Sequence, residues 1–394
     1  MVEPLYLHNG ERVQLCSDAL VDLYKFPPHL LYALPMKSPR DLWYDKYAKE
    51  LNHPERSTIM KVLLIGGTGN ISSSITKRCL ERGDEVWLFN RGNNREFEAM
   101  GAHYIIGNAM DPADLKSKLE GHWFDVAANF IIFRFEDCIS TYEALKGKVG
   151  QFFYISSCTV YQKPCFNTPI TPDTPLKNPY SAYAQTKIKG ELYFNERYRE
   201  DDFPAVIVRP SHTYGEKKLV VGPLMGWGVP HWTLADRILK GQPIIVHGTG
   251  RSLWTATHSD DFAYAFCGLM GNQRAIGHSF HITNDEAMTW DMIMNTYGQI
   301  LGVKPNIVHV PVDFIARFKP NLENGIYGDM VENGVFDIKK LQDFVPGYRT
   351  RIPLRDGLKR SIQWYYDHPD QMVVSEENNK LTDDILEAWD KIRY

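Results

Sequence analysis

The first clear pattern of hydrophobic and polar positions begins at residue 61. Residues 61–65 form a short apolar run typical of a β-strand, a glycine turn follows, and the polar residues after the turn favour the start of a helix. A strand, turn and helix with this spacing direct backbone N–H groups and the positive end of the helix toward a pyrophosphate. Ser72 takes the third small position of the turn, where glycine is usual. The predicted dinucleotide-binding residues of this turn are Gly66, Gly69, Asn70 and Ile71.

A second pattern combines a buried strand with a tyrosine and a lysine. The apolar run at residues 151–157 predicts a strand that delivers the Ser157 hydroxyl to its C-terminal edge. Tyr183 and Lys187 are spaced so that a helix would place both on one face. A nearby lysine cation favours the phenolate and lowers the pKa of a tyrosine, which can then exchange a proton at an alcohol. The predicted catalytic residues are therefore Ser157, Tyr183 and Lys187.

These motifs resemble the extended short-chain dehydrogenase/reductase family, the NAD(P)-dependent epimerase/dehydratase group. The resemblance covers about residues 60–368, and its motifs stand in the family's order. Beyond those already named, they are the Asp111-Pro turn, Cys158-Thr-Val-Tyr161, Val208-Arg-Pro-Ser-His-Thr-Tyr-Gly215, Gly241-Gln-Pro-Ile-Ile-Val-His-Gly248, His258-Ser-Asp-Asp261, and a closing segment from Leu354-Arg-Asp-Gly-Leu to Trp364-Tyr-Tyr. The resemblance implies an α/β fold: a Rossmann-type doubly wound parallel sheet for the cofactor and a smaller C-terminal lobe for the substrate.

The same resemblance suggests the domain organisation. We expect an NAD(P)-binding Rossmann domain at residues 60–215 and a mainly substrate-binding lobe at 216–370, from which a segment at about 258–283 returns to the Rossmann domain. Residues 1–59 lie outside the resemblance and are rich in aromatic residues, which argues against a free tail. We expect this extension to pack on the body or on a partner subunit. Residues 371–394 are expected to form a helical tail.

The cofactor preference is indicated by the residues after the second predicted strand. In this fold a carboxylate there selects NAD, whereas an arginine can hold the extra phosphate of NADP. Asn90 and Arg91 occupy the position, so NADP is favoured over NAD. By resemblance, Asn108 lies near the adenine and Asn129 on the nicotinamide side. The further residues expected to bind the cofactor are Ala109, Tyr183, Lys187, Pro210 and His212.

The expected chemistry is hydride transfer at a secondary alcohol. Tyr183 would take the hydroxyl proton while Ser157 hydrogen-bonds the same oxygen. Dehydratases of the family carry a Thr-Asp-Glu cluster at the serine, and this chain has Ser-Cys-Thr, so water elimination is the least expected reaction. We expect an epimerase acting on a sugar-like substrate. The alternatives are an NADPH-dependent ketone or aldehyde reductase, and an RNA-binding or cofactor-sensing relative without turnover.

The substrate residues are harder to predict. Nucleotide-sugar members of the family place an arginine on the diphosphate where this chain has Trp254, and Arg251 stands three residues earlier. This departure argues against a nucleotide-diphosphate substrate. Indole rings on the glycine-rich loop before residue 232 could stack on a sugar ring or pack in the core. The candidate substrate residues are Thr159, Trp227, His231, Trp232, Arg251 and Trp254.

Composition narrows the possibilities further. The net charge of -4 gives no electrostatic reason to expect nucleic acid or an anionic membrane as partner. No apolar run approaches the roughly 20 residues of a membrane helix, and the six cysteines lack metal or disulfide spacing. We therefore expect a cytoplasmic protein without a metal site. The predicted helix 181–200 has more apolar surface than one face can bury, which favours a homodimer.

Overall fold

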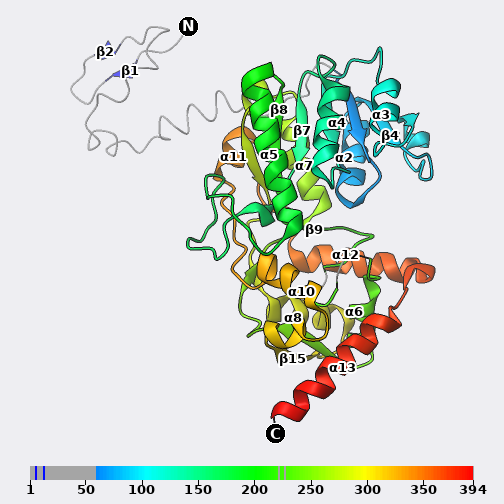
Figure 1. The fold of residues 1–394 in the computed structure, drawn as a ribbon, viewed down its shortest axis with the longest axis vertical. Coiled ribbons are helices and arrows are strands. Elements are labelled where there is room, and N and C mark those ends of the chain that lie inside the picture. The colour runs from blue at the N-terminus through cyan, green and yellow to red at the C-terminus, as the bar shows by residue number, and fades with distance from the viewer. Residues whose placement is uncertain (1–4, 7–11, 14–58, 221, 226–227, 394) are drawn as a thin grey trace. The chain divides into compact units, whose positions relative to one another are not determined.

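The computed structural model describes residues 5–6, 12–13, 59–220, 222–225 and 228–393 (Figure 1). The chain divides into two units, residues 1–56 and 57–394. In the first unit, strand β1 (Leu5–Tyr6) pairs antiparallel with β2 (Arg12–Val13). The packing expected for the rest of residues 1–59 falls largely outside the described residues. All other elements belong to the second unit.

A seven-stranded parallel sheet forms the first lobe of the second unit, with the strand order β13-β8-β7-β6-β3-β4-β5. Its strands are β3 (Lys61–Ile65), β4 (Glu85–Asn90), β5 (His103–Ile106), β6 (Val126–Asn129), β7 (Phe152–Ile155), β8 (Ala205–Pro210) and β13 (Ser279–Ile282). The order reverses between β3 and β6, and in open sheets of this kind ligands bind at the carboxyl ends of the strands beside such a reversal. The predicted Rossmann-type doubly wound fold is confirmed.

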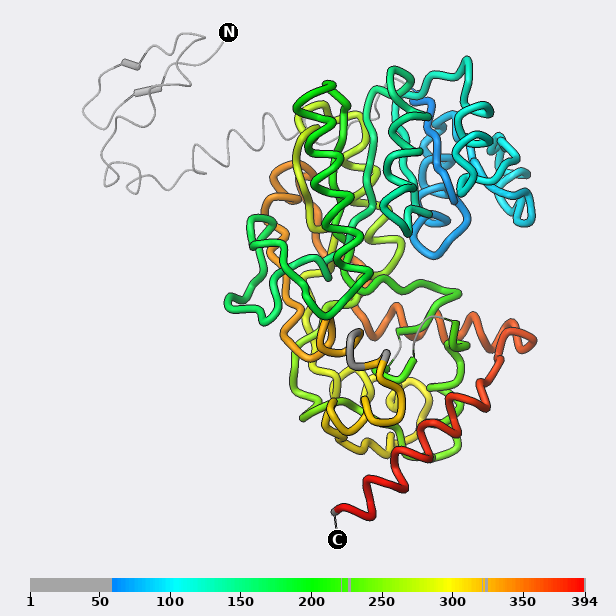
Figure 2. Tube along the Cα trace, viewed as in Figure 1, coloured from blue at the N-terminus to red at the C-terminus, as the bar shows by residue number. Residues whose placement is uncertain are grey.

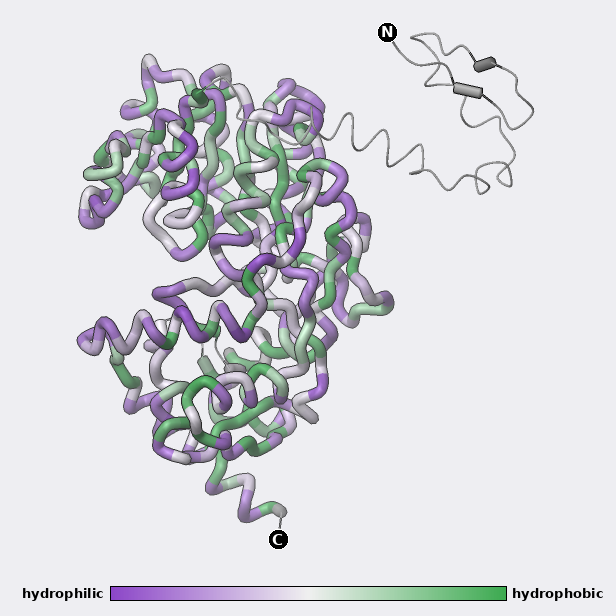
Figure 3. Tube along the Cα trace, turned by 180° about the vertical axis from the view of Figure 1, so that it is seen from behind, coloured by the Kyte–Doolittle hydropathy of each residue, from purple (hydrophilic) through white to green (hydrophobic). Residues whose placement is uncertain are grey.

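Helices cover both faces of this sheet, and the inner strands contribute to two cores. The helices are α2 (Asn70–Glu81), α3 (Pro112–Lys118), α4 (Phe135–Leu145), α5 (Ala182–Asp201), α7 (Ser259–Leu269) and α11 (Lys339–Phe344). Along β3, Val62 and Leu64 pack in one core while Leu63 and Ile65 pack in the other. A strand buried on both faces has a continuous apolar sequence, which explains the pattern at residues 61–65. In Figure 3 the strands between these helices are the greener part of the lobe.

The second lobe is built from short strand pairs and helices. Strand β10 (Pro243–His247) pairs in parallel with β15 (Asn306–Val310), and β11 (Leu253–Trp254) pairs antiparallel with β14 (Met288–Thr289). Its helices are α6 (Trp232–Leu239), α8 (Trp290–Leu301), α9 (Val312–Ala316), α10 (Pro320–Gly325), the π-helical turn η7 (Ile326–Met330), α12 (Leu354–Asp367) and α13 (Glu376–Arg393). Two strands, β9 (His212–Tyr214) and β12 (Ala256–His258), pair in parallel between the lobes. The chain then returns through α7 to β13 in the first lobe (Figure 2).

A buried ion pair ties α5 to the sheet. Arg209 on β8 donates from Nε and Nη2 to the Glu191 carboxylate of α5 at 2.9 and 2.6 Å. Ser156, at the end of β7, donates to the same carboxylate, and Arg209 Nη1 also donates to the Tyr161 hydroxyl at 2.7 Å. The Arg209 side chain is 5% exposed and that of Glu191 0%. Both charges are therefore removed from water and depend on each other.

We expect Glu191→Gln to lower the free energy of unfolding by about 3–5 kcal/mol, because it leaves the buried guanidinium without a counter-charge. The measurement is urea unfolding followed by circular dichroism. Glu196→Gln on the same helix is the matched control, since Glu196 is 48% exposed and pairs with Arg197 at the surface. Equal losses of stability in the two variants would contradict the role given to the buried pair.

Candidate active site

The glycine turn after β3 is held by two glycines and a serine. Gly66 has φ +80°, and a Cβ there would lie 2.7 Å from Ile131 Cγ2. The Ser72 hydroxyl accepts from the Gly69 N–H at 2.8 Å and donates to the Gly66 carbonyl at 2.7 Å. The first turn of α2 carries no acidic residue, so its positive end is open to an anion. These residues fit the pyrophosphate of a dinucleotide, and Ser72 shapes the turn as well as replacing a glycine.

The glycine turn is joined to β9 through Asn70. Asn70 Nδ2 donates to the Thr213 carbonyl at 3.0 Å, beside the predicted cofactor residue His212. His212 Nε2 is buried and has no hydrogen-bond partner in the described part of the chain. Burial, with Lys218 and His231 nearby, lowers the pKa of His212 to about 3. The imidazole is therefore neutral at physiological pH, and its free nitrogen could take a hydrogen bond from a ligand.

Asn90 and Arg91, at the end of β4, differ in whether their side chains are held by hydrogen bonds. Asn90 Oδ1 accepts from the Gly92 N–H at 2.8 Å and so stabilises its own turn. Arg91 is exposed, whereas Arg95 is held by Glu98 at 2.6 Å. Arg91 thus remains the arginine of this turn that could hold an additional phosphate.

The predicted asparagines near the cofactor also have structural tasks. Asn129 is 3% exposed, donates from Nδ2 to Thr141 Oγ1 at 2.9 Å, and accepts the backbone N–H two residues further on at 2.9 Å. Asn108 is exposed and accepts the N–H two residues further on at 3.1 Å, and Ala109 is buried beside it. Pro210 ends β8 next to β13. Both polar groups of the Asn129 side chain are used in hydrogen bonds at the end of β6. The side chain is therefore not free to hydrogen-bond a nicotinamide in the way expected from the sequence.

The Ser157 hydroxyl is oriented by the turn that follows β7. Its Oγ accepts from the backbone N–H and from the Oγ1 of Thr159, at 3.1 and 2.9 Å. A hydroxyl that accepts two hydrogen bonds keeps its own proton to donate. Ser157 is 8% exposed, at the carboxyl end of the strand as predicted. It can therefore donate to the oxygen of a reacting alcohol or ketone.

Lys187 is buried under the site and held in one position. Its Nζ donates to the Ile132 and Ile155 carbonyls, both at 2.8 Å, and lies 5.5 Å from the centre of the Tyr183 ring. Burial lowers the pKa of Lys187 to about 8. The predicted helix places both residues on one side, and the ammonium is fixed beside the phenol.

The titration of Tyr183 differs from the expectation. Burial of the phenol raises the pKa of Tyr183 to about 12, and Asp329 raises it further while Ser157 acts to lower it. The side chain as a whole remains 39% exposed. The expected lowering by Lys187 is not among the effects on this pKa, and burial of the phenolate dominates. Without a ligand, Tyr183 is thus protonated at neutral pH and ready to donate.

The second lobe contributes a carboxylate that sequence reasoning missed. Asn178 Nδ2 donates to the Thr159 carbonyl and to the Gly328 carbonyl, both at 2.7 Å, and so joins the turn after Ser157 to η7. Asp329 follows Gly328 and is close enough to raise the pKa of Tyr183. No periodicity or motif spacing marks this aspartate, because its position depends on how the two lobes pack.

The two candidate tryptophans of the second lobe lie in its core. Trp232 packs on Tyr365 with ring centres 5.1 Å apart, and Trp254 packs on Trp290 at 5.3 Å. Each is 4% exposed. Their large apolar surfaces are buried by neighbouring aromatic rings, so neither is free to stack on a substrate. Trp227 lies outside the described residues.

The other candidate substrate residues are dispersed. His231 is half-buried, and its Nδ1 lies 3.2 Å from the Leu219 carbonyl. Arg251 is exposed on the turn before β11, whereas Thr159 contacts Ser157 directly. Thr159 is therefore the candidate that the structure brings to the predicted catalytic residues.

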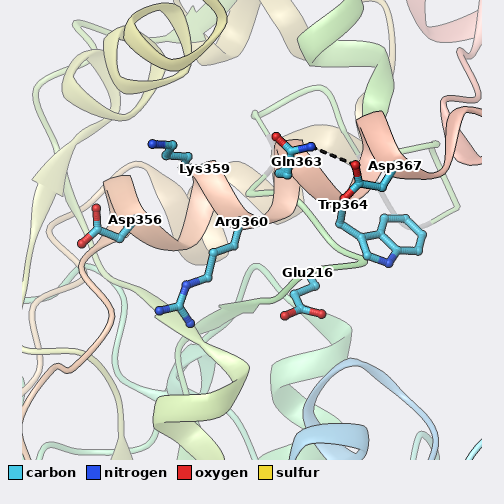
Figure 4. A pocket seen from close by; sticks show the side chains of 7 residues that line it. All are labelled: Glu216, Asp356, Lys359, Arg360, Gln363, Trp364 and Asp367. Carbon is cyan, nitrogen blue, oxygen red and sulfur yellow. Dashed lines mark hydrogen bonds between the residues drawn. The ribbon is translucent and has the colours of Figure 1, made fainter.

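An open cleft of about 560 Å³ lies elsewhere, along α12 (Figure 4). Gln363 and Asp367 are hydrogen-bonded there at 2.9 Å. Its lining residues are Glu216, Asp356, Lys359, Arg360, Gln363, Trp364 and Asp367. None of the three predicted catalytic residues lines it, so volume alone does not identify the reacting site.

Comparison with known proteins supports the resemblance that the sequence motifs predict. The sequence profile of the NAD dependent epimerase/dehydratase family matches residues 139–283, which include Ser157, Tyr183 and Lys187. Over these residues the chain matches the family that its motifs resemble, the extended short-chain dehydrogenase/reductase family. The predicted enzyme class, NAD(P)-dependent and of the extended short-chain type, is thereby confirmed, as is the predicted nicotinamide dinucleotide cofactor.

The individual relatives of this chain differ in activity. A chloroplast stem-loop binding protein of Arabidopsis thaliana is 26% identical over 286 residues, 67% of this chain and 71% of that protein. A 2′-dehydrokanamycin reductase of Streptomyces kanamyceticus is 24% identical over 320 residues, 80% of this chain and 87% of the reductase. The structure of dTDP-glucose 4,6-dehydratase from Bacillus anthracis, in complex with NAD, has a TM-score of 0.64 at 17% identity, covering 79% of this chain and 98% of that one.

Two further findings concern membrane-spanning helices and metal ligands. Within the described ranges, no helix is long and apolar enough to cross a membrane. Among the same residues, no three or more His, Cys, Asp or Glu side chains gather as metal ligands would.

Proposed function

We propose that this enzyme moves hydride between a nicotinamide and a secondary alcohol of a sugar-like substrate, with Tyr183 as acid and base. The observation that carries the proposal is the convergence of three groups at the carboxyl edge of the sheet. Ser157 has a proton to donate, Lys187 is fixed under the site, and the Tyr183 ring lies beside it. The bound nicotinamide supplies the hydride acceptor or donor.

The protein residues would divide the proton chemistry between them. Ser157 donates to the substrate oxygen and holds it next to Tyr183. In reduction Tyr183 gives its proton to that oxygen, and in oxidation it takes the hydroxyl proton back. The Lys187 ammonium stabilises the phenolate that forms in between, at a position where the Ile132 and Ile155 carbonyls prevent it from moving away.

We favour an epimerase, in which oxidation and reduction follow each other on one substrate. The turn Ser157-Cys-Thr-Val-Tyr161 lacks the two carboxylates that water elimination would need at this place. Ketone reduction is the second candidate. It is favoured by the protonated state of Tyr183 and by the similarity to 2′-dehydrokanamycin reductase.

An RNA-binding role is the third candidate. The similarity to the chloroplast stem-loop binding protein favours it. The net charge of -4 argues against it, since nucleic-acid binding depends largely on cationic contacts to phosphate. The positioned Ser157, Tyr183 and Lys187 would also have no task in such a role.

The reaction can be tested with a panel of sugars and keto sugars, each incubated with NADP or NADPH while absorbance of the reduced nicotinamide is followed. Inversion at a carbon without net cofactor consumption is expected of the epimerase. Stoichiometric oxidation of NADPH by a ketone would reject the epimerase and support the reductase.

In either case Tyr183→Phe should reduce turnover by about 10²-fold or more, because it removes the acid–base group and little else. Cofactor binding, measured by calorimetry, should be retained. Tyr180→Phe is the matched control: it removes one hydroxyl from a tyrosine that packs on Tyr327 at the same end of α5. Near-normal turnover of Tyr183→Phe would refute the mechanism.

For the cofactor, we propose a preference for NADP over NAD, based on the exposed Arg91. Arg91→Ala should erase most of the preference, since one charge-assisted hydrogen bond to a phosphate contributes about 1.5–3 kcal/mol. Arg95→Ala is the control, because Arg95 is paired with Glu98 at 2.6 Å. Tighter binding of NAD than of NADP by the unmodified protein would overturn the proposal.

We also propose a homodimer formed through α4 and α5. Phe194 of α5 is buried in the first lobe, whereas Leu192 is 59% exposed, Tyr198 38% and Ile139 of α4 41%. A self-complementary contact would cover these side chains. Light scattering at micromolar concentration should give twice the chain mass, and Leu192→Lys should give monomers. A monomeric unmodified protein would contradict the proposal.

A further inference from the structure

A side-chain ion pair beside the glycine turn joins the first lobe to the segment that follows β9. Lys217 Nζ donates to Glu96 Oε2 at 2.9 Å, although the two residues lie 121 positions apart in the sequence. Glu96 belongs to the turn after β4, which also carries Arg91. Its other oxygen, Oε1, accepts from the Ser73 hydroxyl in the first turn of α2 at 3.3 Å. The pair therefore lies at the helix end that fits the pyrophosphate of a dinucleotide.

The backbone is held at both ends of this pair. The Lys217 carbonyl accepts from the Tyr365 hydroxyl of α12 at 3.3 Å. On the other side, Phe97 follows Glu96 and is 7% exposed in the core of the first lobe. The Lys217 and Glu96 side chains themselves are 62% and 30% exposed. Breaking the pair therefore needs movement of two long side chains and no rearrangement of the backbone.

Two segments flank the start of α2, where the dinucleotide would bind. One is the turn after β4, at which the adenosine ribose binds in sheets of this kind. The other begins at Gly215, where an added Cβ would lie 3.0 Å from Asn70 Oδ1. Glu216 follows and lines the open cleft of about 560 Å³ along α12 (Figure 4). The ion pair thus connects the two flanking segments, next to this cleft.

We propose that the pair of Glu96 and Lys217 is a clasp that opens each time the dinucleotide enters or leaves. The pair joins protein side chains and forms again after each passage, so breaking it costs the same in both directions. The clasp therefore slows binding and release by one factor and leaves the dissociation constant nearly unchanged. Slow exchange suits an enzyme that uses one bound nicotinamide for oxidation and then reduction. The inference goes beyond the proposed function, because it concerns the dinucleotide alone.

The size of the effect follows from the exposure of the pair. An exposed ion pair changes an equilibrium by about two- to fivefold, and salt screens it. Loss of the clasp should speed binding and release by this factor. A direct contact between Lys217 and the cofactor would act differently, because its loss would change the dissociation constant.

Stopped-flow fluorescence of NADPH on the full chain measures both rate constants, and calorimetry measures the dissociation constant. The main variant combines Glu96→Gln with Lys217→Met, which removes the pair and keeps the net charge. Both rate constants should rise about two- to fivefold, while the dissociation constant stays within about a factor of two. In about 1 M NaCl the difference from the unmodified protein should disappear. NADH is used in a parallel series, since its pyrophosphate passes the same clasp.

Two control variants separate the clasp from a general structural effect. Exchanging the charges, Glu96→Lys with Lys217→Glu, forms the pair in the opposite direction and should restore the slow rates. Combining Lys148→Met with Glu120→Gln removes another surface pair, at 2.8 Å, and should change neither rate. That pair precedes β6 and β7 and so lies at the amino edge of the sheet, opposite the cofactor.

The outcomes are distinct. Unchanged rates in the double variant without the pair, or fast rates that persist after the charges are exchanged, would overturn the inference. A higher dissociation constant with an unchanged rate of binding would identify a direct cofactor contact and reject the clasp. Absence of binding of both NADPH and NADH would reject it as well.

Discussion

The buried pair of Glu191 and Arg209 is the interaction on which the rest of the site depends. It joins α5 to β8, and Ser156 connects the end of β7 to the same carboxylate. Lys187 is one helical turn before Glu191, and Ser157 directly follows Ser156, so the pair sets the distance between the two sides of the site. Two charges buried together require nearly ideal geometry. This requirement leaves α5 little freedom to slide along the sheet.

Burial has opposite effects on the two titrating residues of α5. It raises the pKa of Tyr183 to about 12 and lowers that of Lys187 to about 8, because in each case the charged form loses water. The lysine remains largely cationic at neutral pH since two carbonyls accept from it. A site of this kind stores a proton on Tyr183 and a positive charge beneath it. Donating the proton to a ketone then creates a phenolate beside an ammonium that is already in place.

Local sequence patterns predicted those parts of the structure that are determined by residues close to one another in the sequence. The strand, turn and helix at residues 61–81 follow from apolar periodicity and turn chemistry, and Tyr183 and Lys187 share a face because helix geometry requires it. The titration of Tyr183 was mispredicted, since the cost of desolvation depends on what covers the ring. Trp254 was expected near a ligand, but its position depends on Trp290, which is distant in sequence. Sequence spacing carries no information about such contacts.

The position of Asp329 also could not be predicted from sequence spacing. The turn Ser157-Cys-Thr contains no carboxylate, yet one approaches it from a segment of the other lobe. Asn178 donates to the Thr159 carbonyl on one side and to the Gly328 carbonyl on the other, so a single amide joins the turn after Ser157 to η7 of the other lobe. A substrate seated beside this turn would contact both lobes at this point. Its binding energy would then favour the arrangement of lobes in which the two segments lie together.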